Sequence, residues 1–240
     1  MSTITPTTYD GYTVAARIAP ALLATAPVLC LGLAALPLMP GLAKLWSLLG
    51  VAVTTFAASA ARRAGNRVQP DLWERWNGAP TVRKLRYRDN PATAEITRRH
   101  REVERVLGGN LALPNEADEL ADPASADAQY GAAMTRVIDR VRDNSGFALL
   151  NTENRNYGFA RNLYGLKRFG LACCVVVLSM SVGVGVTLGQ LESWRAAAPL
   201  LGSATIAIAT GLLWRQVDPD FVKPSAEAYA DRLIGTLDQQ

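Results

Sequence analysis

Long apolar stretches without a single charged residue lie toward both ends of this 240-residue chain. They span 22, 17, 23 and 19 residues, at Ile18–Met39, Leu45–Ala61, Phe169–Leu191 and Ala196–Trp214. A helix crosses the roughly 30 Å apolar core of a bilayer in about 20 residues. The pattern therefore predicts four transmembrane helices, two before and two after a long polar segment.

The polar segment, residues 62–168, carries apolar residues at helical spacing. A first stripe predicts one face of a helix that ends at Gly108 and Gly109: Ile96, His100, Val103 and Leu107. A second helix is expected after Pro123, with a stripe of Ala126, Tyr130, Met134, Val137, Ile138 and Val141. The segment is therefore expected to be mainly helical.

Three further elements complete the expected secondary structure. A third helix begins near Phe147 and runs into the third span, whereas Thr81–Arg88 alternates loosely, which predicts a short strand. In the C-terminal tail, Ser225 is the expected N-cap of an amphipathic helix, whose stripe is Tyr229, Leu233, Ile234 and Leu237. This helix packs on the polar segment, lies on the membrane or self-associates, and packing is favoured.

The fold class that follows is an all-α membrane protein with four transmembrane helices (2+2). A mainly helical cytoplasmic domain is inserted between spans two and three. The expected regions are the N-terminal tail with spans one and two, the cytoplasmic domain, spans three and four, and the C-terminal amphipathic helix. Their boundaries are 1–61, 62–168, 169–215 and 216–240.

The distribution of positive charge gives the orientation in the membrane. Of 25 lysines and arginines, 19 lie between Arg62 and Arg168, and clusters of them border spans two and three. Cytoplasmic loops collect lysine and arginine near span ends, so residues 62–168 and both termini are expected in the cytoplasm. Trp46 and Trp194 then fall at the outer face of the bilayer, and Trp214 falls at the inner face.

The sequence gives little support to catalytic chemistry. Apolar residues make up 49% of the chain and charged residues 19%, and the motifs of serine hydrolases, nucleotide-binding loops, zinc proteases and EF-hands do not occur. His100 is the single histidine and the three cysteines lie inside predicted spans, so a zinc-ligand set is missing. No enzyme, metal or cofactor is expected, and the acidic run 116–122 is typical of a solvated turn rather than a catalytic carboxylate pair.

The predicted spans contain no ionisable side chain, which argues against proton pumps and ion-coupled carriers. Small residues recur every four positions, a spacing that lets helices approach closely in lipid. The sets are Gly50, Thr54 and Ala58; Ser181, Gly185 and Gly189; and Ser203, Ala207 and Gly211. Packing within one bundle is favoured, and the alternative is a pore between subunits, lined by Ser179, Ser181, Thr187, Thr205 and Thr210.

The stretch Leu72–Asp89, LWERWNGAPTVRKLRYRD, interleaves basic and aromatic residues, and further arginines follow on the next helix. Single-stranded nucleic acids bind where cations follow the phosphates and rings stack on the bases. The candidate ligand contacts are Trp73, Trp76, Arg83, Lys84, Arg86, Tyr87, Arg88, Arg98, Arg99 and Arg101. Anionic lipid headgroups are an alternative ligand, and the tryptophans can equally be core residues.

Net charge alternates along the polar segment. Residues 62–105 carry +6, residues 106–135 carry −5 and residues 136–168 carry +4. Either the opposite charges pair with one another, within or between subunits, or the first basic block binds an anion.

The segment Asn151–Gly170 joins the polar segment directly to the third span and is rich in amides and tyrosines. Its side chains are candidates for transmitting a cytoplasmic event to the membrane: Asn151, Asn154, Tyr157, Arg161, Asn162 and Lys167. The alternative is a capped, solvated start of a helix.

The order of two spans, a basic helical domain, two spans and a short tail resembles membrane effectors of bacterial antiphage systems. Together with the strings LWERWNG…RKLRYRD and ENRNYGFARNLYGLK, it resembles in particular the channel subunit of the Hailong system. The resemblance implies an oligomeric ion channel held closed by a short DNA that a partner nucleotidyltransferase makes. It also implies DNA contacts on the basic domain and depolarisation of the infected cell when the channel opens.

The leading hypothesis is an oligomeric channel of the bacterial inner membrane, active in antiphage defence. An anionic ligand, either a short single-stranded DNA or a nucleotide, gates it through the cytoplasmic domain. The alternative is a non-conducting membrane scaffold that recruits a soluble partner protein through the same domain. In both hypotheses the other partners are the lipid bilayer and further copies of the chain.

Overall fold

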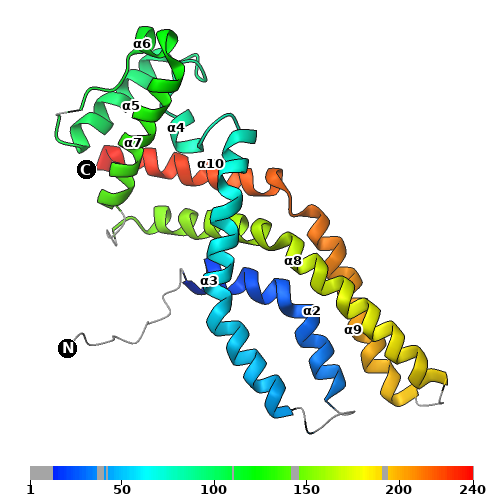
Figure 1. Cartoon of the computed structure of the whole chain (residues 1–240). Coiled ribbons are helices and arrows are strands. Elements are labelled where there is room, and N and C mark those ends of the chain that lie inside the picture. Colours follow the sequence, from blue (N-terminus) through cyan, green and yellow to red (C-terminus); the bar gives the residue numbers. More distant parts are fainter. Residues whose placement is uncertain are drawn as a thin grey trace, which may run out of the picture. The chain divides into compact units, whose positions relative to one another are not determined.

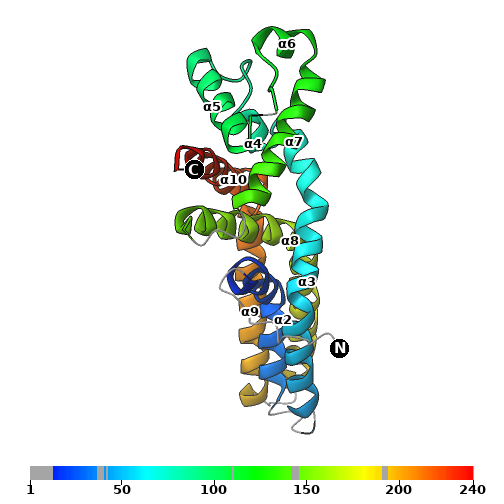
Figure 2. The ribbon, with the colours of Figure 1, turned by 90° about the vertical axis from the view of Figure 1, so that its left-hand side faces the viewer.

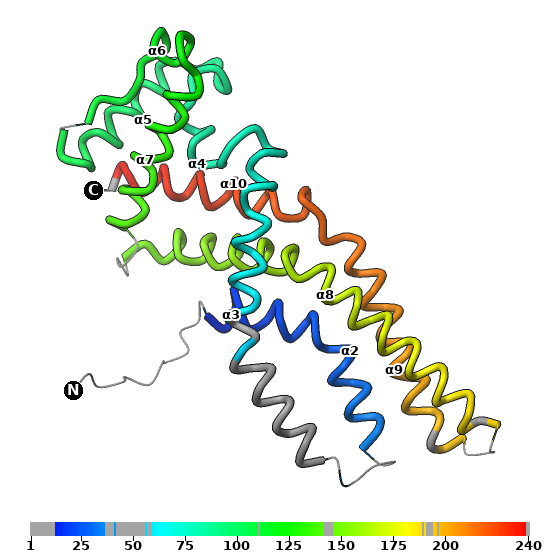
Figure 3. The backbone as a smooth tube through the Cα atoms, viewed as in Figure 1, coloured from blue at the N-terminus to red at the C-terminus, as the bar shows by residue number. Residues whose placement is uncertain are grey.

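The computed structural model describes residues 13–36, 41, 43–109, 111–141, 146–190 and 194–239, and for some helical positions, including 43–55, only the backbone. Over these ranges the regular elements are all helical (Figure 1), and Figure 3 traces their backbone. The chain divides into two compact units. We call residues 1–68 with 158–222 the apolar unit, and residues 69–157 with 223–240 the polar unit.

Parts of four long helices build the apolar unit. They are α2 (Ala19–Ala35), which the π-helical turn η1 (Val14–Ile18) precedes, the first part of α3 (Ala43–Arg75), the second part of α8 (Ala148–Gln190) and α9 (Trp194–Gln216). The helix α2 packs along α9, and it lies between α3 and α9 (Figure 1 and Figure 2). Their shared core includes Ala24 of α2, Ala61 of α3, Val177 of α8 and Ala207 of α9.

Three segments are long and apolar enough to cross a membrane: Val14–Ala35, Ala148–Leu188 and Ala197–Gln216. They overlap the first, third and fourth predicted spans over most of their length, and they characterise the chain as a multi-pass helical membrane protein. The second predicted span, Leu45–Ala61, falls within α3. Most of its side chains lie outside the described residues, so a fourth span stays a prediction.

The helices α3 and α8 contact each other through glycines. A Cβ atom at Gly165 would overlap the backbone of Ala64 and Gly65, and a Cβ atom at Gly65 would overlap the side chain of Asn162. Asn162 is 2% exposed, and its Nδ2 donates a 2.7 Å hydrogen bond to the carbonyl oxygen of Ala16. Small residues and one buried amide therefore hold η1, α3 and α8 together at one level.

Hydroxyl groups join α8 to α9 further along the apolar unit. The Oγ atoms of Ser181 and Ser203 lie 2.7 Å apart and are buried, and Ser203 donates to the carbonyl oxygen of Leu200. Gly185 and Ala207 are buried too. These small residues pack within one protomer, as favoured from the sequence, and the pore-lining assignment of Ser181 is corrected. The set at 50, 54 and 58 lies outside the described side chains.

The two tryptophans of α9 differ in exposure. Trp194 is 63% exposed, which suits a residue at a membrane interface. Trp214 is only 3% exposed, and its indole packs where Gly170 of α8 has no side chain. The ring of Trp214 therefore packs inside the unit, because the glycine opposite it leaves room, and its position at the inner face of the bilayer stays a prediction.

Short helices surround the core of the polar unit. They are α4 (Pro80–Arg83), α5 (Thr93–Val106), α6 (Glu116–Ala121), α7 (Pro123–Val141), α10 (Pro219–Gly235) and the 3-10 turn η3 (Leu237–Gln239), with the ends of α3 and α8. The core includes Val103 of α5, Tyr130 and Val137 of α7, and Leu233 and Leu237 from the tail, all at 0% exposure. The helices predicted from both apolar stripes are confirmed, and so is packing of the tail helix.

Two predictions about secondary structure are wrong. Thr81–Arg88 is no strand: Pro80 opens the short helix α4, and a turn follows it. Proline fits the first helical position, where no backbone donor is needed. The tail helix begins at Pro219 rather than after Ser225, since Asp218 Oδ1 accepts a 2.8 Å hydrogen bond from the Phe221 N–H and caps it there.

The contact between α3 and α8 makes a testable prediction. Gly165→Ala is expected to destabilise the protein by about 1–3 kcal/mol, because the new methyl group meets backbone atoms that cannot move aside. Gly183→Ala on the same helix is the matched control, since nothing lies within 4 Å of its added carbon. Thermal unfolding in detergent measures both, and equal melting temperatures for the two variants would contradict the prediction.

Candidate functional site

Arg86 lies at the centre of the charged side chains of the polar unit. Its side chain is 3% exposed. Nε and Nη2 donate to the two carboxylate oxygens of Asp127 on α7, at 2.8 and 2.6 Å, and Nη1 donates to Asp89 at 3.1 Å and to the carbonyl of Asn77. Gly78 leaves the space that this guanidinium occupies. A bidentate pair at this depth is a structural contact that a ligand does not reach.

Arg88 shares the Asp127 carboxylate and adds a second one. Its Nη2 lies 2.7 Å from Asp127 Oδ2, and its Nη1 lies 2.9 Å from Glu119 Oε1. Glu119, on α6, is 2% exposed and also accepts hydrogen bonds from the backbone N–H groups of Tyr87 and Arg88 at 2.9 and 3.1 Å. The acidic block thus supplies counter-charges for Arg86 and Arg88 of the preceding basic block.

The titration of Glu119 follows from these contacts. Burial alone would raise the pKa of its carboxyl, but the donors of Tyr87, Arg88 and Tyr130 outweigh that effect and hold the pKa below its usual value. The Tyr130 hydroxyl lies 2.9 Å from Glu119 Oε2 and 3.1 Å from the Pro114 carbonyl oxygen. Burial, and then Glu119, raise the pKa of Tyr130, so the tyrosine stays a donor.

His100, the single histidine, belongs to the same cluster. It is 4% exposed, its Nε2 lies 2.8 Å from the Leu85 carbonyl oxygen, and its ring packs on Tyr87 and Tyr130 at centroid distances of 5.0 and 5.2 Å. Burial lowers its pKa. A neutral imidazole that donates to Leu85 fits this environment, and the residue serves the core rather than a metal or a catalytic site.

Arg83 and Lys84 are paired with the tail helix α10. Arg83 Nη1 lies 2.9 Å from Glu227 Oε1, and Lys84 Nζ lies 2.6 Å from Asp231 Oδ1 and 3.5 Å from Glu227 Oε2. Arg83 Nε also lies 3.5 Å from Asp89. The two cations are 28% and 25% exposed. Unlike Arg86, they remain in contact with solvent and can exchange partners.

The three arginines of α5 differ in their contacts. Arg98 pairs with Glu95 and Glu102 of its own helix and, at 3.1 Å, with Asp238 of the C-terminal turn η3. Arg99 pairs with Glu95 at 3.1 Å and donates to the Lys84 carbonyl oxygen. Arg101 is exposed and makes one long 3.5 Å contact, to the backbone oxygen of Thr97. Among the candidate cations, Arg101 is the one for which the described residues supply no carboxylate.

The candidate stacking residues are also largely covered. Trp76 is 6% exposed, Trp73 is half-buried, and each has a buried indole Nε1 without a hydrogen-bond partner among the described atoms. The half-buried ring of Tyr87 packs on His100, and its hydroxyl lies 3.3 Å from Thr97 Oγ1. The structure thus brings the basic and aromatic candidates together, but its contacts join them to the protein itself.

Of the two interpretations of the alternating charge, the contacts favour pairing within the chain. The partners that sequence reasoning missed are Glu119, Asp127, Glu227, Asp231 and Asp238. The block charges +6 and −5 were the available signal. They indicated that pairing takes place but not which residues pair.

The coupling candidates all lie on α8. Tyr157 stacks on Tyr229 of α10 with ring centroids 6.1 Å apart. Arg161 Nη2 lies 3.4 Å from the Oδ1 of Asn162, which is the amide that contacts Ala16. Asn151, Asn154 and Lys167 are half-buried. Tyr157 and Asn162 therefore lie on the two sides of the division between the units, in one uninterrupted helix.

The other pore candidates lie on the protomer surface or at its edge. Ser179, Thr187 and Thr205 are exposed, and Thr210 is half-buried. The hydroxyls of Thr187 and Thr205 donate to the carbonyl oxygens of Gly183 and Leu201, four residues earlier. That bond satisfies a hydroxyl that faces lipid as well as one that faces a partner helix.

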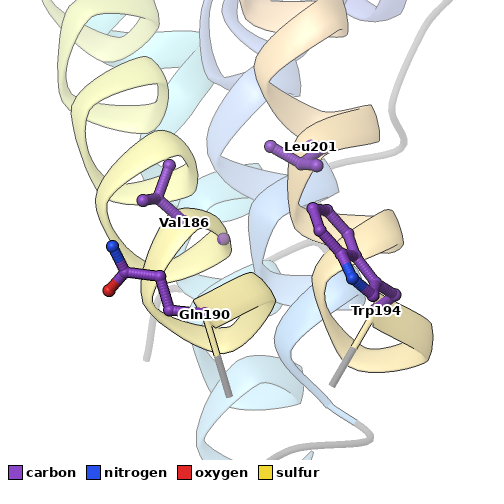
Figure 4. Close-up of a pocket in the computed structure, with 5 residues that line it drawn as sticks. Val186, Gln190, Trp194 and Leu201 are labelled. Carbon is purple, nitrogen blue, oxygen red and sulfur yellow. The ribbon is translucent and has the colours of Figure 1, made fainter. Parts of the chain in front are cut away.

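A pocket of about 440 Å³ opens between the adjoining ends of α8 and α9. Figure 4 shows its lining of Val186, Gln190, Trp194 and Leu201, and Gly185 completes it. The polar side-chain groups of this lining are the Gln190 amide and the Trp194 indole N–H, neither of which is charged, so the pocket suits an apolar group rather than an ion.

Among the described residues, no group of three or more histidine, cysteine or acidic side chains is placed to hold a metal ion. Comparisons with protein-family models, curated proteins and solved structures find no match to this chain. The class that its helices define is a multi-pass, all-helical membrane protein with a charged polar unit.

The burial of Arg86 makes a second prediction. Asp127→Asn is expected to cost roughly 3 kcal/mol of stability, because the guanidinium stays charged at 3% exposure and loses its bidentate partner. Asp231→Asn is the matched control and is expected to cost about 0.5 kcal/mol, since that carboxylate is 58% exposed. Denaturant unfolding measures both losses, and similar values would show that Arg86 tolerates the loss of its partner.

A third prediction concerns acid. The pKa of Glu119 lies below its usual 4.5 in the folded protein. The stabilisation is complete above the pKa of the unfolded chain and is lost as the pH falls through the folded value. Glu119→Gln should reduce stability at neutral pH and weaken its decline below pH 4.5. The melting temperature as a function of pH measures this. If its decline at low pH is the same in the variant, other carboxyl groups cause the acid sensitivity.

Proposed function

We propose that this protein is an oligomeric ion channel of the bacterial inner membrane, gated by an anionic ligand on its polar unit. In this proposal a short single-stranded oligonucleotide is the ligand, and the channel acts without catalysis in antiphage defence, as the resemblance implies. Both termini and residues 62–168 are cytoplasmic in this arrangement. The observation that supports gating is the continuity of α8, one helix of 43 residues that begins in the polar unit and contains the third span.

The tail helix supplies a second connection of the same kind. Only two residues separate it from the end of α9. Leu233 of α10 and Leu237 of the following turn η3 are completely buried in the core of the polar unit. A ligand that changes how α10 is held would therefore act on the cytoplasmic end of the fourth span. A ligand shifts such an equilibrium only by its differential affinity for the two states.

The ligand contacts in this proposal are the cations that remain accessible. Arg83, Lys84 and Arg98 would exchange exposed or half-exposed carboxylates for phosphates, and Arg101 would contribute a charge that is unpaired in the described structure. Arg86 and Arg88 are left to the internal network. Subunit contacts around the pore would involve the exposed Ser179, Thr187 and Thr205.

A membrane scaffold without conduction is the second candidate. Six cations of the polar unit are paired with its own carboxylates, so these six need no anion from outside. The unit also exposes large apolar side chains, with Leu120 of α6 at 83% and Leu149 of α8 at 62%. Apolar side chains of this kind are typical of protein-binding surfaces. A soluble defence protein would be the partner.

Ion flux from liposomes containing the purified protein, with and without short single-stranded DNA, tests the proposal. Flux that changes on DNA addition is expected, and the change should be lost in the triple variant Arg83→Gln, Lys84→Gln and Arg101→Gln. The control variant removes three other charges, at Arg136, Arg140 and Arg232, and should respond normally. No flux in any condition from inserted, folded protein, with co-purification of a soluble protein, would favour the scaffold.

A further inference from the structure

One group of cations without a partner lies near the ends of the predicted spans. The ion pairs described above all join side chains of the polar unit. Six exposed arginines of the apolar unit have no hydrogen-bond or ion-pair partner among the described residues. Arg195 lies at the start of α9, and the other five form a separate group. These five residues, which we call the arginine rim, are Arg62, Arg63, Arg67, Arg168 and Arg215.

Contacts within the apolar unit place the α3 and α8 arginines at one level. Gly165 of α8 lies against Gly65 of α3. Arg62, Arg63 and Arg67 are at most three residues from Gly65, and Arg168 is three residues from Gly165. At 1.5 Å per residue, each is within about 4.5 Å of the crossing along its helix axis.

The arginine of α9 joins the same level through a second contact. Gly170 of α8 packs against the Trp214 indole, and Arg215 is the next residue of α9. Gly170 is two residues from Arg168. Three helices therefore present exposed guanidinium groups within about two helical turns of each other along the unit.

Little negative charge in the apolar unit can neutralise the rim. Its described acidic residues are Asp218 and Asp220, and Asp218 Oδ1 already caps α10 by accepting from Phe221. On α3 the arginines occupy the exposed face, since Ala61 and Gly65 form the buried one. The guanidinium groups therefore point away from the unit, toward whatever surrounds it.

We propose that the arginine rim binds the headgroup phosphates of anionic phospholipids. Arg62 and Arg63 directly follow the apolar run of the second predicted span, Arg168 directly precedes the third, and Arg215 directly follows the fourth. Side chains at such boundaries lie at headgroup depth, where phosphate is concentrated. A guanidinium fork bonds two phosphate oxygens at once. This inference does not depend on ion conduction or on an oligonucleotide ligand.

Retention of lipid by the full chain tests the proposal. The purified protein is titrated in detergent with phosphatidylglycerol or, separately, with phosphatidylcholine, and bound lipid is counted by native mass spectrometry. Arg62→Gln, Arg63→Gln and Arg67→Gln are combined in one variant. Arg136→Gln, Arg140→Gln and Arg232→Gln form the control, which removes three exposed charges of the polar unit. A second rim variant, Arg168→Gln with Arg215→Gln, is measured as well, and it replaces the first variant if that one does not fold.

The rim variants are expected to lose roughly tenfold or more in affinity for phosphatidylglycerol. Phosphatidylcholine binding should be unchanged, and the control should bind both lipids as the parent does. Unchanged phosphatidylglycerol affinity in both rim variants overturns the proposal, and so does an equal loss in the control. Displacement of the lipid by inorganic phosphate or by a short oligothymidylate at equal concentration would also overturn it, because the rim would then be a site for soluble anions.

Discussion

A charged guanidinium that water cannot reach must be surrounded by acceptors, and Arg86 imposes this requirement on the whole polar unit. Its acceptors come from the turn after α3, from Asp89 and from Asp127 on α7. Arg88 extends the same network to Glu119 on α6. The segment around Arg86 and the helices α6 and α7, which lie about 30 to 40 residues further along the chain, are thus held in the one relative position that pairs every buried charge. The apolar core of α5, α7 and α10 packs around that arrangement.

The sequence predicted most of the helices but not the ion-pair partners of the arginines. The stripes of α5 and α7 and the apolar spans predicted those helices, because helical periodicity is a local property of the chain. The strand at Thr81–Arg88 and the helix start at Ser225 were wrong because Pro80 and Asp218 decide the backbone there. Local pattern also could not show the burial of Arg86 or its pairing with Asp127, 41 positions away. Such contacts depend on the tertiary fold.

The chain keeps two populations of positive charge that composition alone cannot separate. In the polar unit, Arg83, Arg86 and Arg98 have carboxylates from the chain itself. In the apolar unit, the arginine rim has none among the described residues. The mixture of basic and aromatic residues in Leu72–Asp89 led to the first population as candidate ligand contacts. The second population is therefore available to an anion from outside the chain. An unpaired guanidinium on the surface costs little, and at membrane depth it attracts a phosphate.

Internal pairing also limits how a ligand on the polar unit could act. The apolar stripe of α10 is buried, so releasing the whole helix would expose Leu233 and Leu237 at about 1.5–3 kcal/mol for each side chain. The ion pairs of Arg83 and Lys84 with Glu227 are partly exposed and exchange at much smaller cost. A phosphate ligand would therefore shift α10 along its polar face while the apolar face stays in contact. Since only two residues separate α9 from α10, a shift of that size would, in the proposed gating, reach the fourth predicted span without unfolding the polar unit.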